Sequence, residues 1–167
     1  MNSRRGLILG GTGMLAGVST TLVAAGWHIV LPSRRYAPLA VDGTGRARWV
    51  RADWTRPNDL ACQAARVLGG QADLLVAWVA DTVRIPVLRA VGPLLKPHAP
   101  VVEVHADRPM DPVLDTHRTH QVVLGEVGYA GRTRWLTDEE ITTGVLEAID
   151  RALAGQPPMA RRLAERV

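Results

Sequence analysis

The chain has 167 residues, of which 47% are hydrophobic and 22% are charged, and its formal net charge is +4 at pH 7. This length and composition predict one globular domain that is large enough to bury a core. The basic charge comes almost wholly from arginines spread between Arg4 and Arg166, which does not predict the concentrated stripe of a nucleic-acid-binding protein. The lone cysteine, Cys62, excludes an internal disulfide framework and a cysteine-rich zinc site. Its place in a helical pattern predicts a small buried residue.

Apolar runs of strand length alternate with stretches of helical period, which is typical of βαβ units and a parallel sheet. The expected strands cover residues 6–10, 27–32, 47–52, 73–79, 100–105 and 120–127. The expected helices cover residues 14–25, 58–69, 84–96 and 138–154. Pro93 is expected to kink or shorten the third helix, because proline cannot continue the backbone hydrogen-bond ladder.

The polar residues at the helix starts support these boundaries. Asn58 and Asp59 can cap the second helix, and Pro86 is expected in the first turn of the third. Thr137 and Glu140 have the spacing of a capping box for the fourth helix.

The C-terminal third of the chain contains a second structural signal. The glycine-rich residues 128–131 indicate a turn that could close a hairpin between 122–127 and 132–136. We expect residues 1–155 to form one nucleotide-binding domain. For the charged tail 156–167 the sequence allows three alternatives: a short helix, a contact in an oligomer or a frayed end.

Residues 7–17, LILGGTGMLAG, are the most informative segment, because an apolar strand breaks into a glycine turn and continues as a helix. Gly10, Gly13 and Ala16 fit the spacing of a dinucleotide-binding fingerprint. The first residue makes the tight turn, the second lets the backbone approach a pyrophosphate, and the third lets the helix pack on the strand. The N–H groups at the helix start favour the anion. The alternative is a purely structural turn.

The end of the second expected strand indicates which dinucleotide is bound. Ser33, Arg34 and Arg35 follow this strand, and the sequence has no Asp or Glu between Ala16 and Val41. An acidic residue at this place would hold the ribose 2′-hydroxyl of NAD, whereas arginine accommodates the 2′-phosphate of NADP. The residues therefore favour NADP(H), and the alternative is an exposed basic loop.

These segments resemble the short-chain dehydrogenase/reductase superfamily, and its small atypical members in particular. The resemblance covers residues 5–154. It implies an α/β doubly wound Rossmann domain with parallel strand order 3-2-1-4-5-6 and NADP(H) at the switch point. In the family, an aspartate after the third strand meets the adenine ring, and the fourth strand passes the cofactor ribose. The implied cofactor contacts are Gly10, Thr12, Gly13, Met14, Leu15, Ser33, Arg34, Arg35, Asp53, Trp54, Ala77, Trp78 and Val79.

The sequence departs from the family at the residues that carry its chemistry. The usual catalytic Tyr-x-x-x-Lys is absent, because neither Tyr36 nor Tyr129 has a lysine four positions later. Only the proline-interrupted segment 108–119 joins the fifth and sixth strands, which is too short for the long helix that normally carries that motif. A carbonyl reductase of the usual mechanism is therefore not expected.

Two residues remain as candidate catalytic groups. His105 ends the fifth strand, and the ordinary pKa of histidine suits proton transfer near neutral pH. Its alternative role is a structural hydrogen bond to a loop carbonyl. Tyr129 could donate a proton from the turn after the sixth strand, or be an ordinary surface tyrosine. Asp81 could simply cap the next helix. No metal site is expected, because His117 and His120 have no third ligand at suitable spacing.

The resemblance and the residues together predict an NADPH-dependent reductase that acts on a small-molecule carbonyl or imine. The alternative is a non-catalytic NADP(H)-binding sensor or complex partner. A homo-oligomer is expected, because the part of the chain that would cover the substrate is small and leaves the cofactor cleft open to water. Arg4 and Arg5 before an apolar run are similar to an export signal, but glycines interrupt the run and a further strand follows at once. A cytoplasmic protein with no membrane or nucleic-acid partner is therefore expected.

Overall fold

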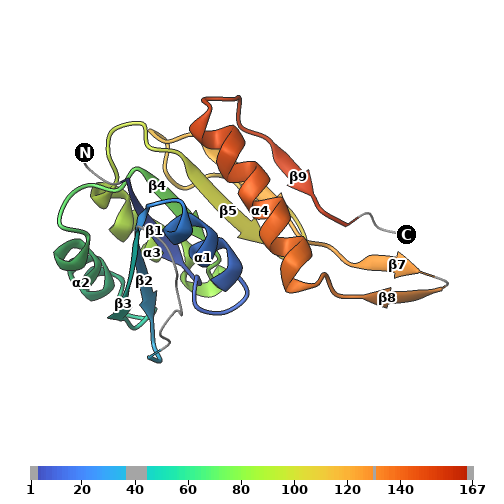
Figure 1. The fold of residues 1–167 in the computed structure, drawn as a ribbon, viewed down its shortest axis with the longest axis horizontal. Coiled ribbons are helices and arrows are strands. Elements are labelled where there is room, and N and C mark those ends of the chain that lie inside the picture. Colours follow the sequence, from blue (N-terminus) through green and yellow to red (C-terminus); the bar gives the residue numbers. More distant parts are fainter. Residues whose placement is uncertain (1–3, 37–44, 130, 165–167) are drawn as a thin grey trace.

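The computed structural model describes residues 4–36, 45–129 and 131–164 (Figure 1). Within these residues, seven parallel strands form one sheet in the order β3-β2-β1-β4-β5-β6-β9, and β7 and β8 form an antiparallel hairpin. The strands of the sheet are β1 (Arg5–Leu9), β2 (His28–Ser33), β3 (Arg46–Arg51), β4 (Leu74–Ala77), β5 (Val101–His105), β6 (Thr119–Val123) and β9 (Ala160–Arg162). The hairpin consists of β7 (Val127–Tyr129) and β8 (Arg132–Arg134). The helices are α1 (Ala16–Ala24), α2 (Pro57–Leu68), α3 (Asp81–Val91) and α4 (Asp138–Leu153), with a 3-10 turn η1 (Gly92–Leu94).

Helices cover both faces of the sheet, and each face has its own hydrophobic core. On one face, α1 and α4 bury residues such as Val18 and Val145 against Ile8 of β1. On the other face, α2 and α3 bury residues such as Leu60 against Leu7 and Leu9. Neighbouring residues of β1 therefore belong to opposite cores, as the two-residue period of a strand requires.

The predicted strand order is confirmed, and it positions the site. The chain runs outward from β1 through β2 to β3, then returns to place β4 on the other side of β1. Ligands of doubly wound sheets bind outside the carboxyl ends of the strands at such a switch point. The carboxyl ends of β1, β2, β4 and β5 are therefore where a site should be sought.

The C-terminal tail adds a seventh strand, which the sequence did not predict. β9 pairs in parallel with β6, with Val122 opposite Arg161. β6 itself ends at Val123, four residues before the expected 127, and the hairpin forms between 127–129 and 132–134. In Figure 1 this hairpin extends beyond the end of α4, away from the sheet.

The residues expected at the starts of α2 and α3 lie elsewhere in the structure. α2 begins at Pro57 with Arg56 at its N-cap and no side-chain cap among the described residues, so Asn58 and Asp59 lie inside its first turn. α3 begins at Asp81, which places Pro86 inside the helix rather than in its first turn. The helix then ends before Pro93, which lies in the short turn η1, so the expected shortening is confirmed.

Two further side-chain expectations can be compared with the structure. The capping box of α4 is confirmed: the Glu140 backbone N–H donates to Thr137 Oγ1, and the Thr137 N–H donates to Glu140 Oε1, both at 3.1 Å. Cys62 lies in α2 as expected, but it is exposed, because it falls outside the buried stripe that contains Ala61 and Ala64.

Candidate functional site

The glycine turn between β1 and α1 is shaped by two glycines with different surroundings. Gly10 has φ +85°, and a Cβ there would lie 2.8 Å from the Trp78 carbonyl oxygen, so this position requires glycine. No described atom lies within 4 Å of a Cβ placed on Gly13, so the turn is open at that residue. The hydroxyl of Ser19 donates to the Gly11 carbonyl at 3.0 Å and holds the turn from the buried side. The turn thus presents open backbone toward the carboxyl edge of the sheet.

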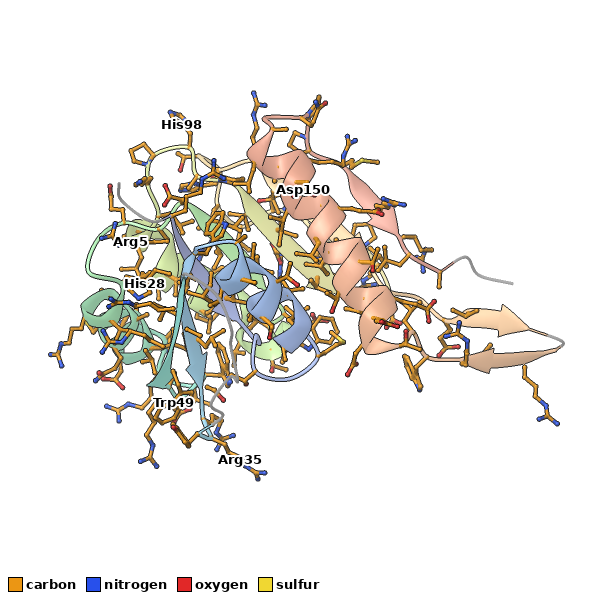
Figure 2. All side chains as sticks on the ribbon, viewed as in Figure 1. Arg5, His28, Arg35, Trp49, His98 and Asp150 are labelled. Atoms are coloured by element: carbon orange, nitrogen blue, oxygen red, sulfur yellow. The ribbon has the colours of Figure 1, made fainter. Side chains whose placement is uncertain are left out.

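The carboxyl end of β2 lies beside this turn. Thr12 Oγ1 makes a long hydrogen bond of 3.5 Å to Ser33 Oγ, which in turn donates to the Arg35 carbonyl at 3.0 Å. Arg34 and Arg35 are exposed, and Arg35 projects outward from the end of the strand (Figure 2). The structure therefore brings the glycine turn and the basic strand end together, as the predicted NADP site requires.

Asp53 and Trp54 follow β3 at the same edge. Asp53 Oδ1 accepts hydrogen bonds from the backbone N–H and the hydroxyl of Thr55, at 2.9 and 2.7 Å. These bonds lower the pKa of Asp53, with a smaller contribution from the charge of Arg34. Trp54 packs against the core between the sheet and α2 and α3. The carboxylate of Asp53 is therefore held charged beside the basic strand end.

The end of β4 forms the wall between the glycine turn and a larger cleft. Ala77 is buried in the sheet, and the Trp78 backbone N–H donates to the Leu9 carbonyl at 2.9 Å. The tryptophan side chain covers Gly10, because its Cβ lies only 3.1 Å from the Cβ position of that glycine. Trp78 and Val79 then continue into the cleft.

A cleft of about 820 Å³ lies between the carboxyl ends of β4 and β5. Its lining comes from the two segments that follow these strands: Trp78, Val79, Ala80, Asp81, Val104, His105, Ala106, Asp107, Arg108 and Met110. His105 is thus placed in the cleft, with 7% of its surface exposed. Of the predicted site residues, Tyr129 is in β7 of the projecting hairpin, where its backbone pairs with Arg132.

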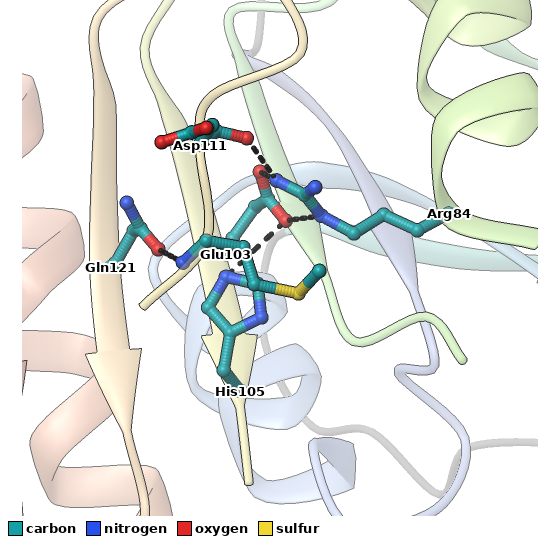
Figure 3. A network of polar contacts seen from close by, with 6 residues as sticks. Arg84, Glu103, His105, Asp111 and Gln121 are labelled. Atoms are coloured by element: carbon teal, nitrogen blue, oxygen red, sulfur yellow. Dashed lines mark hydrogen bonds and ion pairs between the residues drawn. The ribbon is translucent and has the colours of Figure 1, made fainter. Parts of the chain in front are cut away.

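A buried ion pair lies beneath the cleft. Arg84 of α3 donates two hydrogen bonds to the carboxylate of Glu103 in β5, at 2.8 and 2.9 Å, and each residue is only 3% exposed. His105 Nε2 lies 3.4 Å from Glu103 Oε2 (Figure 3). This pair was not predicted, although the sequence contains a signal for it: Arg84 falls on the buried face of a helix, and Glu103 interrupts an apolar strand.

Arg84, together with Gln121 of β6, also makes hydrogen bonds to the segment that joins β5 to β6. Arg84 also donates to the Asp111 carbonyl at 2.9 Å, and the Met110 backbone N–H donates to Gln121 Oε1 at 2.8 Å (Figure 3). Residues 106–118 are all described, and none of them is helical. A loop therefore covers this part of the sheet where a crossover helix would ordinarily lie, and it combines these polar contacts with the packing of Val113 and Leu114 against the core.

The surroundings of His105 lower its pKa from 6.5. Burial is the largest cause, because it disfavours the charged ring, and the positive charge of Arg84 acts in the same direction. The carboxylates of Glu103 and Asp81 and the side chain of Gln121 oppose this change. The neutral form of the His105 ring therefore predominates at pH 7.

A second, smaller hollow of about 360 Å³ lies between the glycine turn and the end of β6. Its lining includes Met14, Leu124 and Leu136, together with Trp135, which is 73% exposed. Among the described residues, no group of three or more His, Cys, Asp or Glu side chains is arranged to hold a metal. None of the helices in the described ranges is long and apolar enough to cross a bilayer.

Comparison with known proteins gives a clear result for the fold. No family model matches the chain, and no curated protein does. The structure is similar to a short-chain type dehydrogenase/reductase from Mycobacterium ulcerans, with a TM-score of 0.73 and 13% identity over 98% of this chain and 89% of that one. It is also similar to a short-chain dehydrogenase/reductase from Brucella melitensis, with a TM-score of 0.67 and 13% identity over 98% and 97% of the two chains.

A third similar structure is that of the NADH-dependent reductase A1-R′ in complex with NAD, with a TM-score of 0.66 and 16% identity over 96% of this chain and 95% of that one. At these identities the likeness concerns the fold. The chain therefore has the Rossmann fold of short-chain dehydrogenases/reductases, and the resemblance inferred from the sequence is confirmed at that level.

Proposed function

We propose that this protein is an NADPH-dependent reductase of the short-chain dehydrogenase/reductase type that acts on a small-molecule carbonyl or imine. The observation that carries the proposal is the meeting of three features at the carboxyl edge of one sheet. These are the open turn at Gly13, the basic strand end at Arg34 and Arg35, and the cleft that His105 lines.

The residues at the turn fit a dinucleotide with a 2′-phosphate. An open backbone at Gly13 leaves room for a pyrophosphate beside the start of α1. The hydroxyls of Thr12 and Ser33 and the guanidinium groups of Arg34 and Arg35 supply donors for the additional phosphate. The similar reductase A1-R′ is described as NADH-dependent, so cofactor choice has to be argued from these residues of the present chain.

A bound reduced nicotinamide supplies a hydride, and the protein contributes binding, orientation and proton transfer. A ketone also needs a proton at its oxygen, and His105 is the ionisable ring in the cleft that is placed to exchange one. Tyr129 remains a second candidate donor. An iminium substrate is already cationic and accepts hydride without that proton. The missing Tyr-x-x-x-Lys therefore does not exclude hydride transfer.

The cofactor assignment is tested by titrating the protein with NADPH and with NADH while tryptophan fluorescence is followed. We expect NADPH to bind more tightly by about tenfold or more, because a charge-assisted contact to phosphate contributes ~1.5–3 kcal/mol. Arg34→Ala combined with Arg35→Ala should remove the preference. The matched control is Arg46→Ala with Arg48→Ala, which removes the same charge from exposed positions nearer the start of β3. Equal affinity of the unmutated protein for both cofactors would contradict the assignment.

A second candidate function is a non-catalytic NADP(H)-binding sensor or complex partner. It is favoured by the loop at residues 106–118, where the family's catalytic helix would lie. The two functions are separated by measuring NADPH oxidation with a panel of carbonyls and imines. Turnover of a carbonyl that falls by about 10²–10⁴-fold in His105→Ala, with NADPH affinity unchanged, supports the enzyme. Tight NADPH binding without turnover on any member of the panel supports the sensor.

The proposal includes self-association and a cytoplasmic location. Among the described residues, the lining of the cleft comes from the segments that follow β4 and β5 and from the end of β5, and hydride transfer benefits from excluding water. A second copy of the chain would supply the missing cover. The cytoplasmic assignment rests on Arg4 and Arg5 leading into β1, whose residues Leu7 and Leu9 belong to the core of the fold.

A further inference from the structure

The contact between His105 and Glu103 constrains the hydrogen on the imidazole ring. His105 Nε2 is buried, and no described residue makes a hydrogen bond to it that meets the usual geometric limits. Its closest charged neighbour is Glu103 Oε2, at 3.4 Å. Glu103 cannot turn away from the ring, because both of its oxygens accept hydrogen bonds from Arg84. Figure 3 shows the second ring nitrogen of His105 turned away from Glu103.

Electrostatics then selects one tautomer of the neutral ring. An Nε2 without hydrogen would place its lone pair close to the negative oxygen of Glu103, which is repulsive. An Nε2 with hydrogen places a positive N–H close to the same oxygen, which is attractive even without the alignment of a full hydrogen bond. Since only one nitrogen of a neutral imidazole carries hydrogen, Nδ1 is left as an acceptor.

We propose that Glu103, clamped by Arg84, is a positioning residue that holds the hydrogen of His105 on Nε2 and leaves Nδ1 as the proton-accepting atom at the cleft. The inference deepens the proposed function, on which its catalytic consequence rests. The tautomer itself does not depend on any substrate or cofactor. The groups that face the ring are Glu103 in β5, Arg84 and Asp81 in α3, and Gln121 in β6.

The neutral state of the ring makes it a proton acceptor at neutral pH, and the tautomer determines that Nδ1 is the accepting atom. With a dinucleotide bound, His105 Nδ1 would accept the hydroxyl proton of a bound alcohol while the hydrogen on the carbinol carbon would leave as a hydride to the oxidised nicotinamide. The products would be the ketone, the reduced cofactor and a protonated ring. In the reverse reaction, His105 must first take a proton from solvent, which it then gives to the carbonyl oxygen. Alcohol oxidation should therefore accelerate, and ketone reduction slow, as the pH rises through the pKa of His105, which burial lowers below 6.5.

The tautomer can be measured by NMR of protein labelled with ¹⁵N at histidine, in the absence of cofactor. The chain has five histidines, so the signals of His105 are identified by their loss in His105→Gln. Protonated and unprotonated ring nitrogens have well-separated ¹⁵N shifts. At pH 7.5 we expect Nε2 to be protonated and Nδ1 unprotonated. Hydrogen on Nδ1 would overturn the proposal.

A pair of variants tests whether Glu103 is responsible. Glu103→Gln removes the charge but leaves Arg84 buried without its partner, which can prevent folding. The combination Arg84→Met with Glu103→Leu avoids that unpaired charge. In this double variant we expect His105 to lose its tautomer preference and the pH profile of alcohol oxidation to shift. An unchanged tautomer would overturn the positioning role. The control is Glu140→Gln, which removes an exposed carboxylate paired with Arg134 and should leave the signals of His105 unchanged.

The two proposals fail in different ways. The expected tautomer without turnover on any alcohol, ketone or imine supports the role of Glu103 and contradicts the enzyme. Turnover with hydrogen on Nδ1 supports the enzyme and contradicts the role of Glu103.

Discussion

Gly10 and Gly13 lie three residues apart in one turn, but they are glycine for different reasons. At Gly10 the positive φ and the nearby Trp78 carbonyl leave no room for a side chain. At Gly13 the protein itself leaves the space empty. A residue that no neighbour forces to be small points to a ligand that approaches the backbone there.

The two positions should therefore respond differently to substitution. Gly13→Val should leave the thermal unfolding temperature nearly unchanged and abolish NADPH binding, because the new side chain occupies the space of the pyrophosphate. Gly10→Val should lower the stability itself, by about 1–3 kcal/mol or more, through backbone strain and overlap with Trp78. The measurements are calorimetry and fluorescence titration. A folded Gly13→Val variant that binds NADPH normally would show that the turn is not the cofactor site.

The local structure around Gly10, Gly13 and Arg34 was more predictable from the sequence than the environment of His105, for a physical reason. Gly10 and Gly13 lie in a turn and Arg34 lies at a strand end, and both features can be predicted from residues that are consecutive in the sequence. The environment of His105 depends on Arg84, which is 21 positions away in the chain, and on Glu103 being buried beside it. A charged residue within an apolar pattern, such as Glu103, indicates that it needs a partner, but periodicity does not identify that partner, which only tertiary packing brings close.

At the scale of elements, strands with strong apolar character were predictable and β9 was not. β1, β4 and β5 are buried on both faces and are consequently apolar throughout most of their length. β9 contains Ala160, Arg161 and Arg162, which are exposed at the edge of the sheet, and only three residues pair with β6. Such a short edge strand forms because a neighbouring strand is available for pairing, and its own sequence contains almost no pattern that predicts a strand.

The attachment of β9 should depend on a contact with α4 as well as on its pairing with β6. A Cβ on Gly144 would lie 2.5 Å from both Cδ atoms of Leu163, immediately after β9. Gly144→Ala should displace Leu163, destabilise the protein by about 1–3 kcal/mol and speed proteolysis of residues 156–164. Leu163→Ala in the same chain removes the overlapping atoms and should recover most of the loss attributable to overlap. Urea denaturation and limited proteolysis measure the two effects. A stable, protease-resistant Gly144→Ala variant would show that this contact does not hold the strand.

At the scale of the whole molecule, the hairpin formed by β7 and β8 is unusual because it has little support. Each strand has three residues, and the pair extends away from the sheet (Figure 1). Two-stranded hairpins are marginally stable in water without further packing. At its base, Arg134 pairs with Glu140, and Trp135 is 73% exposed. This combination is typical of a segment that packs against another copy.

We therefore expect the protein to form a homodimer or a larger assembly at micromolar concentration. Light scattering should give at least twice the 18.1 kDa mass of one chain. Trp135→Ser should weaken the association if the base of the hairpin lies in the interface, whereas Tyr36→Ser removes another exposed aromatic residue, at the end of β2, and should have no effect. A monomer mass in the presence of cofactor would contradict this expectation.

The segment 106–118 has a consequence for motion. A helix in this position would lock its amide hydrogens in a continuous ladder, whereas this segment is fixed at a few points, including Met110, Asp111 and His117. Its opening requires those bonds to break and Val113 and Leu114 to leave the core, while β5 and β6 remain paired beneath it. Amide hydrogens of residues 106–118 should therefore exchange with solvent deuterium much sooner than those of β5, through a local fluctuation rather than global unfolding. One wall of the cleft can then move to admit and release ligands while the rest of the fold stays intact.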